Sequence, residues 1–295
     1  MRELRVPMPR IGTHKLWEML PGVLAEHKIS IGRDKLFDLL EEHGLLLRRR
    51  KRKKAITTDS NHQFRKYPNL VRELQPVGPN QLWVSDITYI RLAEEFGYLS
   101  LITDAYSRKI VGYCLYPSLH KEGPVTALQM ALVGLPAGRH NLIHHSDRGI
   151  QYCCDAYTSI LAARGIKISM TEKGDPYENA LAERVNRTMK EEFLLDRGFT
   201  RFELAWDAVA KAVDTYNNLR PHDSCNRMTP EQAHRQSGPM QKRWKKHKRT
   251  QQAPAESVPV GNPSFSDDAF ISGSNTGHLL NVKALSEKKV SNHKN

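Results

Sequence analysis

The sequence lacks the features that would place it in a membrane or in an oxidising compartment. No apolar run approaches the roughly 20 residues that a membrane-spanning helix needs, and Met1–Arg10 has no apolar segment of the kind that a signal peptide carries. Only four cysteines occur, and none forms a C-x-x-C pair. We therefore expect reduced thiols, no zinc site and a cytoplasmic location.

Acidic residues are absent from two short strips that carry the excess of positive charge. The first strip consists of seven consecutive basic residues, Arg48, Arg49, Arg50, Lys51, Arg52, Lys53 and Lys54. The second, Gln241–Arg249, adds six more Lys and Arg. The formal net charge is +13, and without these thirteen residues the 45 basic residues fall to 32, equal to the 32 acidic ones. Two interpretations stay open: a solvated surface, and contact with the phosphates of a polyanion.

The first 47 residues have the pattern of two helices separated by a short turn. Apolar residues recur at helical spacing up to Leu24, and a second helix is expected from about Arg33 to His43, before Gly44. Two helices followed by a basic stretch are typical of a helix-turn-helix DNA reader, in which Arg33 and Lys35 would start the second helix and contact the groove. A plain helical hairpin gives the same pattern.

Residues 80–240 have the pattern of an α/β core. The expected elements are strands at 82–90, 98–103 and 110–116, a helix at 124–135, a strand at 141–146, a helix at 155–164, a strand at 166–170, and helices from about 176 and at 201–217. Three antiparallel strands followed by two parallel ones predict a mixed sheet covered by helices on both faces. Residues 48–79 are expected to form a basic linker, and residues 241–295 a basic and then disordered tail.

Two aspartates are singled out by their positions on predicted strands. Asp86 lies in mid-strand between Val84 and Ile87, where a carboxylate is costly unless it is paired or binds a metal. Asp147 follows a strand that ends at Ser146, and ligands of open α/β sheets gather at the carboxyl ends of strands. Both are therefore candidates for a metal or catalytic site.

A third candidate acid lies on the helix expected from about Pro176. Asp175 and Glu178 fit the N-cap and N3 positions of a capping box, so they already have a structural role. Glu183 shares one open helix face with Asn186, Arg187 and Lys190, beside the predicted buried stripe of Ala182, Val185, Met189 and Phe193. A carboxylate followed by cations suits metal binding with DNA phosphate contact, and it equally suits an exposed salt-bridge ladder.

Several motifs together resemble one family, the DDE transposases of bacterial insertion sequences. They are W-x-x-D-I-T-Y at Trp83–Tyr89, H-S-D-R-G-x-Q-Y at His145–Tyr152, N-A-x-A-E at Asn179–Glu183, R-P-H at Arg220–His222 and T-P-E-Q-A at Thr229–Ala233. Thirty-five residues separate Asp147 from Glu183, and a lysine follows seven residues after the glutamate; both spacings match the family. The group that the chain resembles uses two overlapping reading frames, and the chain is similar to the second-frame product over about residues 10–249.

The resemblance implies a ribonuclease-H-like fold with a retroviral-integrase-like core, in which Asp86, Asp147 and Glu183 are catalytic and hold metal. It implies two Mg²⁺ (or Mn²⁺) ions, which serve the attacking and the leaving oxygen of phosphodiester transfer. Lys190 and Arg187 would contact terminal DNA. The implied partners are the element's terminal inverted repeats, target DNA, further copies of the chain and an upstream-frame product, at the nucleoid.

Two other functions stay open. A DNA-binding regulator could occupy element ends without cutting, but such a binder has no use for buried acids. A ribonuclease-H-like nuclease could act on hybrids, but the integrase-type spacing and the basic strips disfavour it.

Overall fold

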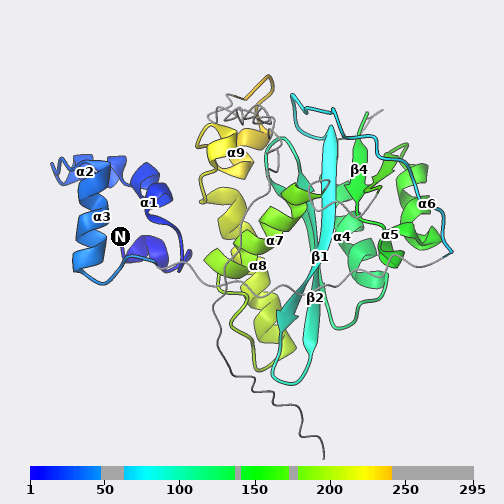
Figure 1. Cartoon of the computed structure of the whole chain (residues 1–295), viewed down its shortest axis with the longest axis horizontal. Coiled ribbons are helices and arrows are strands. Elements are labelled where there is room, and N and C mark those ends of the chain that lie inside the picture. Colours follow the sequence, from blue (N-terminus) through cyan, green and yellow to red (C-terminus); the bar gives the residue numbers. More distant parts are fainter. Residues whose placement is uncertain (48–62, 137–140, 173–178, 241–295) are drawn as a thin grey trace, which may run out of the picture. The chain divides into compact units, whose positions relative to one another are not determined.

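The computed structural model describes residues 1–47, 63–136, 141–172 and 179–240 (Figure 1). Its strands are β1 (Leu82–Arg91), β2 (Phe96–Asp104), β3 (Ile110–Tyr116), β4 (Ile143–Ser146) and β5 (Lys167–Met170). Its α-helices are α1 (Thr13–Met19), α2 (Pro21–Glu26), α3 (Arg33–Glu42), α4 (Glu122–Val133), α5 (Ile150–Cys153), α6 (Asp155–Ala163), α7 (Ala180–Glu192), α8 (Phe202–Asn218) and α9 (Pro230–His234), and two 3-10 turns span Glu3–Arg5 and Asp223–Cys225. Both basic strips and the predicted capping box at 175–178 lie outside the described residues.

The five strands form one mixed sheet in the order β3-β2-β1-β4-β5. The first three strands pair antiparallel, and β4 joins β1 and β5 in parallel. The predicted sheet is therefore confirmed, with strand ends that differ from the expectation by two residues or fewer. After β3 at the edge of the sheet, the chain crosses back so that β4 pairs with β1. The central strand β1 therefore has β2 as an antiparallel neighbour and β4 as a parallel one.

Helices cover both faces of this sheet, with α7 and α8 on one side and α4 and α6 on the other (Figure 1). Because side chains alternate along a strand, Ile90 and Leu101 pack with Val185 of α7. Trp83 and Ile102 point the other way and pack with the apolar face of α4. Each face therefore has its own apolar cluster, and β1 contributes to both.

The N-terminal residues form three short helices. The first predicted helix is split, because α1 ends at Met19 and α2 begins with Pro21. The second predicted helix is confirmed as α3, whose Leu36 and Leu40 are buried while Arg33 and Lys35 are exposed. Its role in reading DNA stays a prediction. The described helices and the core belong to one compact unit, Met1–Lys245.

The motif at Thr229–Ala233 builds α9 and its attachment to the core. The Thr229 side chain accepts a hydrogen bond from the Gln232 backbone N–H, and the Gln232 side chain accepts one from the Thr229 backbone N–H, which completes a capping box. Lys109 pairs with Glu231 of α9 at 2.6 Å. The motif therefore has a structural role at the end of the fold.

All four cysteines are buried free thiols, as the sequence predicts. Among the residues that the structure describes, no helix has the length and apolar character needed to cross a bilayer.

Candidate active site

Asp86 and Asp147 come together because their strands are parallel neighbours. Val84 of β1 is aligned with His145 of β4, and each aspartate lies two residues farther along its chain. Adjacent strands lie about 4.8 Å apart, and residues at the same level point to the same face. Asp147 accepts a hydrogen bond from the Gly149 backbone at 3.0 Å, which fixes one of its oxygens just past the end of β4.

Both oxygens of the Asp86 carboxylate accept hydrogen bonds, but burial and nearby negative charges disfavour its ionised form. Its Oδ1 accepts from the Ile87 backbone at 2.9 Å, and its Oδ2 accepts from the Asn186 side chain at 2.8 Å. A little of its surface remains accessible, but the surrounding protein removes most of its solvation. Burial, together with the charges of Asp147 and Glu183, raises its pKa to about 7 against the opposing hydrogen bonds.

Glu183 lies in the first turn of α7, because the helix begins later than the sequence suggests. The backbone of Asn179 is not helical, and the first helical residue is Ala180, four residues beyond the expected start near Pro176. The Glu183 side chain is exposed, whereas the predicted stripe of Ala182, Val185, Met189 and Phe193 is buried. An acid in the first turn also suits the positive end of the helix dipole.

Two asparagines attach α7 to β1, and one of them corrects the sequence interpretation. Asn186 was expected on the open face with Glu183, but it is 5% exposed and donates to Asp86. Asn179 donates to the Ser85 carbonyl at 3.0 Å. The helix that carries Glu183 is therefore tied to the strand residues 85 and 86. Sequence reasoning missed Asn186 because its partner lies 100 residues away.

The carboxylates of Asp86, Asp147 and Glu183 are suitable ligands for a hard divalent cation, although their oxygens are not clustered closely enough to hold one. Burial and, to a smaller extent, the charges of Asp147 and Glu183 raise the pKa of Asp86. Magnesium prefers such oxygen ligands. Across residues 1–47, 63–136, 141–172 and 179–240, no group of three or more His, Cys, Asp or Glu side chains is close enough to hold a metal ion.

The two cations predicted on this helix differ in their surroundings. Arg187 is exposed on α7, one turn beyond Glu183. Lys190 is half-buried, and its ammonium lies 5.8 Å from the centre of the Tyr89 ring, within cation–π range. Burial lowers the pKa of Lys190, and the charges of Asp86 and Asp196 oppose that shift. Lys190 therefore adds positive charge at the edge of the acidic site.

The two histidines before Asp147 lie in the core. His144 contacts the Ser85 hydroxyl at 2.7 Å and the Tyr157 hydroxyl at 2.8 Å, and burial lowers its pKa to about 3. His145 contacts the Ser169 hydroxyl at 2.8 Å and is fully buried. Both rings are therefore buried in the core, where they hydrogen-bond to neighbouring elements.

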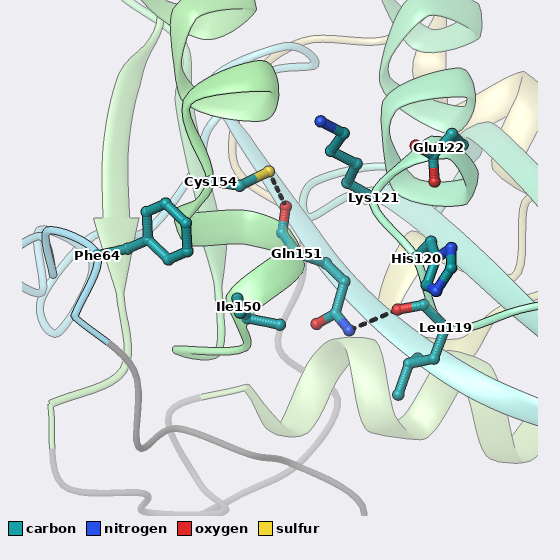
Figure 2. A pocket seen from close by; sticks show the side chains of 8 residues that line it. All are labelled: Phe64, Leu119, His120, Lys121, Glu122, Ile150, Gln151 and Cys154. Carbon is teal, nitrogen blue, oxygen red and sulfur yellow. Dashed lines mark hydrogen bonds between the residues drawn. The ribbon is translucent and has the colours of Figure 1, made fainter.

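A pocket of about 380 Å³ lies beside the segment that follows Asp147 (Figure 2). Its lining comes from three parts of the chain: Phe64, Leu119, His120, Lys121, Glu122, Ile150, Gln151 and Cys154. Gln151 donates to the Leu119 carbonyl at 2.8 Å and so connects α5 with the segment before α4. None of the three candidate acids lines this pocket.

Comparisons with known proteins identify the family to which this fold belongs. Two profiles of the family described as "Integrase core domain" match residues 76–176 and 164–230. The chain is 38% identical over 235 residues to "Insertion element IS600 uncharacterized 31 kDa protein" of Shigella sonnei, which covers 77% of this chain and 85% of that protein. It is 29% identical over 232 residues to "Transposase for insertion sequence element IS904" of Lactococcus lactis, covering 73% and 91% respectively.

Among solved structures, the catalytic core domain of HTLV-2 integrase in complex with magnesium is 19% identical, with a TM-score of 0.44 over 54% of this chain and 99% of that one. The matched profiles, which together span the sheet and α7, define a DNA transposase or integrase enzyme. The chain belongs to the family of insertion-sequence transposases with an integrase core domain.

Proposed function

We propose that this chain nicks the ends of its insertion sequence and transfers the resulting DNA strands to a target, with Asp86, Asp147 and Glu183 as the catalytic acids. The observation that supports the proposal is the position of Asp86 on β1, where burial, together with the charges of Asp147 after β4 and Glu183 on α7, raises its pKa to about 7. Such a cluster is costly in a fold without a cation, and perturbed carboxylates of this kind are candidates for function.

The roles of the acids follow from how each is held. Asp86 has both oxygens oriented by hydrogen bonds, and it would hold two Mg²⁺ (or Mn²⁺) ions together with Asp147 and Glu183. When bound, such ions activate the attacking oxygen and stabilise the leaving oxygen of a phosphodiester. The attacking group is water in the nicking step and the freed 3′-hydroxyl in the joining step, so no protein nucleophile is required.

The proposed DNA contacts are of two kinds. Arg187 and Lys190 lie on α7 beyond Glu183 and would contact the phosphates of the terminal DNA next to the acids. Arg33 and Lys35 at the exposed start of α3, together with the basic strip Arg48–Lys54, would bind the terminal repeat. Joining two element ends to one target requires at least two copies of the chain on DNA, and an upstream-frame product is a further proposed partner.

The decisive experiment is an assay of cleavage and joining with element-end DNA and Mg²⁺. Wild-type protein is expected to nick and join, and Asp147→Asn is expected to lose about 10³-fold or more in rate, equivalent to about 4 kcal/mol of transition-state stabilisation. Asp104→Asn is a matched control, since Asp104 is a buried carboxylate whose partners are the Ser107 backbone and hydroxyl and the Asn80 backbone.

Equal rates for wild type and Asp147→Asn would contradict the assignment of the acids. Tight binding of end DNA with no cutting by either protein would favour the DNA-binding regulator instead.

A further inference from the structure

A second carboxylate on α7, Glu192, is enclosed by cations from two distant parts of the chain. Arg220 donates from Nε to one Glu192 oxygen at 2.7 Å and from Nη2 to the other at 2.8 Å. Lys15 of α1 donates to the same carboxylate at 3.1 Å. We call these three side chains the Glu192 cluster. It joins an N-terminal helix, the last residue of α7 and the segment after α8.

The Glu192 cluster is largely shielded from solvent. The side chains of Arg220, Glu192 and Lys15 are 5%, 18% and 21% exposed. The Arg220 guanidinium also lies 5.5 Å from the centre of the Tyr216 ring and contacts the His222 ring at 2.6 Å. The R-P-H motif therefore builds one wall of the cluster. The Glu192 backbone carbonyl takes a further hydrogen bond from the Arg10 backbone at 3.0 Å.

Arg220 and Lys15 stabilise the charged form of Glu192. Burial alone would raise the pKa of Glu192, but the hydrogen bonds and charges of Arg220 and Lys15 outweigh burial and lower it. A two-pronged guanidinium–carboxylate contact fixes orientation as well as distance. Buried ion pairs often contribute little net stability compared with apolar packing, so the geometric constraint is the more informative property of this cluster.

The Glu192 cluster lies at the end of α7 opposite to the candidate acids. Glu183 and Glu192 are nine residues apart, about 13 Å at 1.5 Å per residue. At the acidic end, Asn179 and Asn186 attach α7 to β1. With the other end held by Arg220 and Lys15, the helix can neither slide nor rotate without breaking charged hydrogen bonds. Such movements are those that would carry Glu183 away from Asp86.

We propose that Arg220 and Lys15 are positioning residues, which act through Glu192 to fix α7 and thereby the place of Glu183 beside Asp86. Because Lys15 belongs to α1, the same contact ties the catalytic helix to the N-terminal helices. This inference rests on the proposed function, since it assigns Glu183 a role in binding the metal.

The test compares folded full-length variants in two measurements made without DNA: hydrogen exchange of the α7 amides, and Mn²⁺ affinity followed by electron paramagnetic resonance. Arg220→Met and Lys15→Met are expected to speed exchange in α7 but not in β3, and to raise the Mn²⁺ dissociation constant by up to about tenfold, as for residues that orient metal ligands at one remove. Arg220→Lys keeps the charge without the two-pronged contact, so an intermediate value is expected.

Lys109→Met is the matched control. Lys109 pairs with Glu231 of α9 at 2.6 Å, with both side chains 26% exposed, and that pair does not involve α7. It should leave α7 exchange and Mn²⁺ affinity unchanged. A folded Arg220→Met variant with wild-type values in both measurements would overturn the inference. If that variant does not fold, Lys15→Met decides, because it leaves the Arg220 contact intact. If wild-type protein does not bind Mn²⁺, the proposed metal site fails, and α7 exchange alone decides the positioning role.

Discussion

Helix α7 contributes to two carboxylate clusters whose electrostatics are opposite. Near its start, Asp86, Asp147 and Glu183 repel one another, and the pKa of Asp86 rises to about 7. At its end, Glu192 is paired with Arg220 and Lys15, and its pKa falls. The first cluster stores unfavourable energy that a cation would relieve, whereas the second is complete within the protein. The difference separates the proposed metal site from the contact proposed to hold the helix in place.

One carboxylate in each cluster can be replaced by an amide of the same shape, and the largest expected effect on stability comes from the replacement at Glu192. Glu192→Gln leaves two buried cations without their counter-charge and is expected to cost about 2–3 kcal/mol of unfolding free energy. Asp86→Asn removes a carboxylate from a repulsive site, so its effect without metal is expected to lie within about 0.5 kcal/mol or to be stabilising. Denaturant unfolding in the presence of a chelator measures both. A larger loss for Asp86→Asn than for Glu192→Gln would reverse the comparison.

The two clusters also predict opposite contributions to stability as pH changes. The raised pKa of Asp86 means that its favourable contribution is present below its ordinary value of 3.8 and is lost as pH rises towards about 7. Glu192, with a lowered pKa, contributes above its ordinary range and loses that contribution as pH falls through its folded value. Over pH 4–7, metal-free Asp86→Asn should therefore lack a decline on the order of 2 kcal/mol that the wild type has.

Chelated samples of wild type and Asp86→Asn, unfolded at several pH values, test that difference. Parallel pH profiles for the two proteins would mean that Asp86 is not strained by its neighbours. Glu192→Gln serves as the reference, since it should retain the wild-type decline towards neutral pH.

Periodicity and strand position were sufficient to predict the sheet, and they single out two of the three candidate acids, whose role stays a prediction. The alternation of β1 and the short strand before Asp147 carry that information locally, and the structure confirms the mixed sheet. The start of α7 was predicted wrongly, because Asp175, Pro176 and Glu178 fit a capping box while the first helical residue is Ala180. Local patterns set element types more firmly than element boundaries.

The contacts that organise the candidate site could not be predicted from local patterns. Asn186 bonds to Asp86 across 100 residues, and Lys15 reaches Glu192 across 177. Nothing in the spacing of an asparagine or a lysine on a helix identifies such a partner, because tertiary packing alone brings the two together. The R-P-H motif was recognisable as a signature, but its role needed the position of Glu192.

The smallest expected effect comes from replacing Asn186, whose side chain contacts Asp86 in the first cluster and lowers the pKa that burial and the other acids raise. Its amide stabilises the charged form of Asp86, so Asn186→Ala should raise the pKa of that carboxyl further. Because ionised Asp86 is the form that would bind metal, the pH of half-maximal DNA cleavage should rise by about one unit, and the rate at pH 7 should fall about fivefold as the ionised fraction falls. Asn179→Ala is the matched control, since Asn179 attaches the same helix through the Ser85 carbonyl and does not contact the acid. A pH profile that shifts equally in both variants would mean that Asn186 acts only by holding α7. Its contact with Asp86 would then no longer support the distinction between the first cluster and the Glu192 cluster.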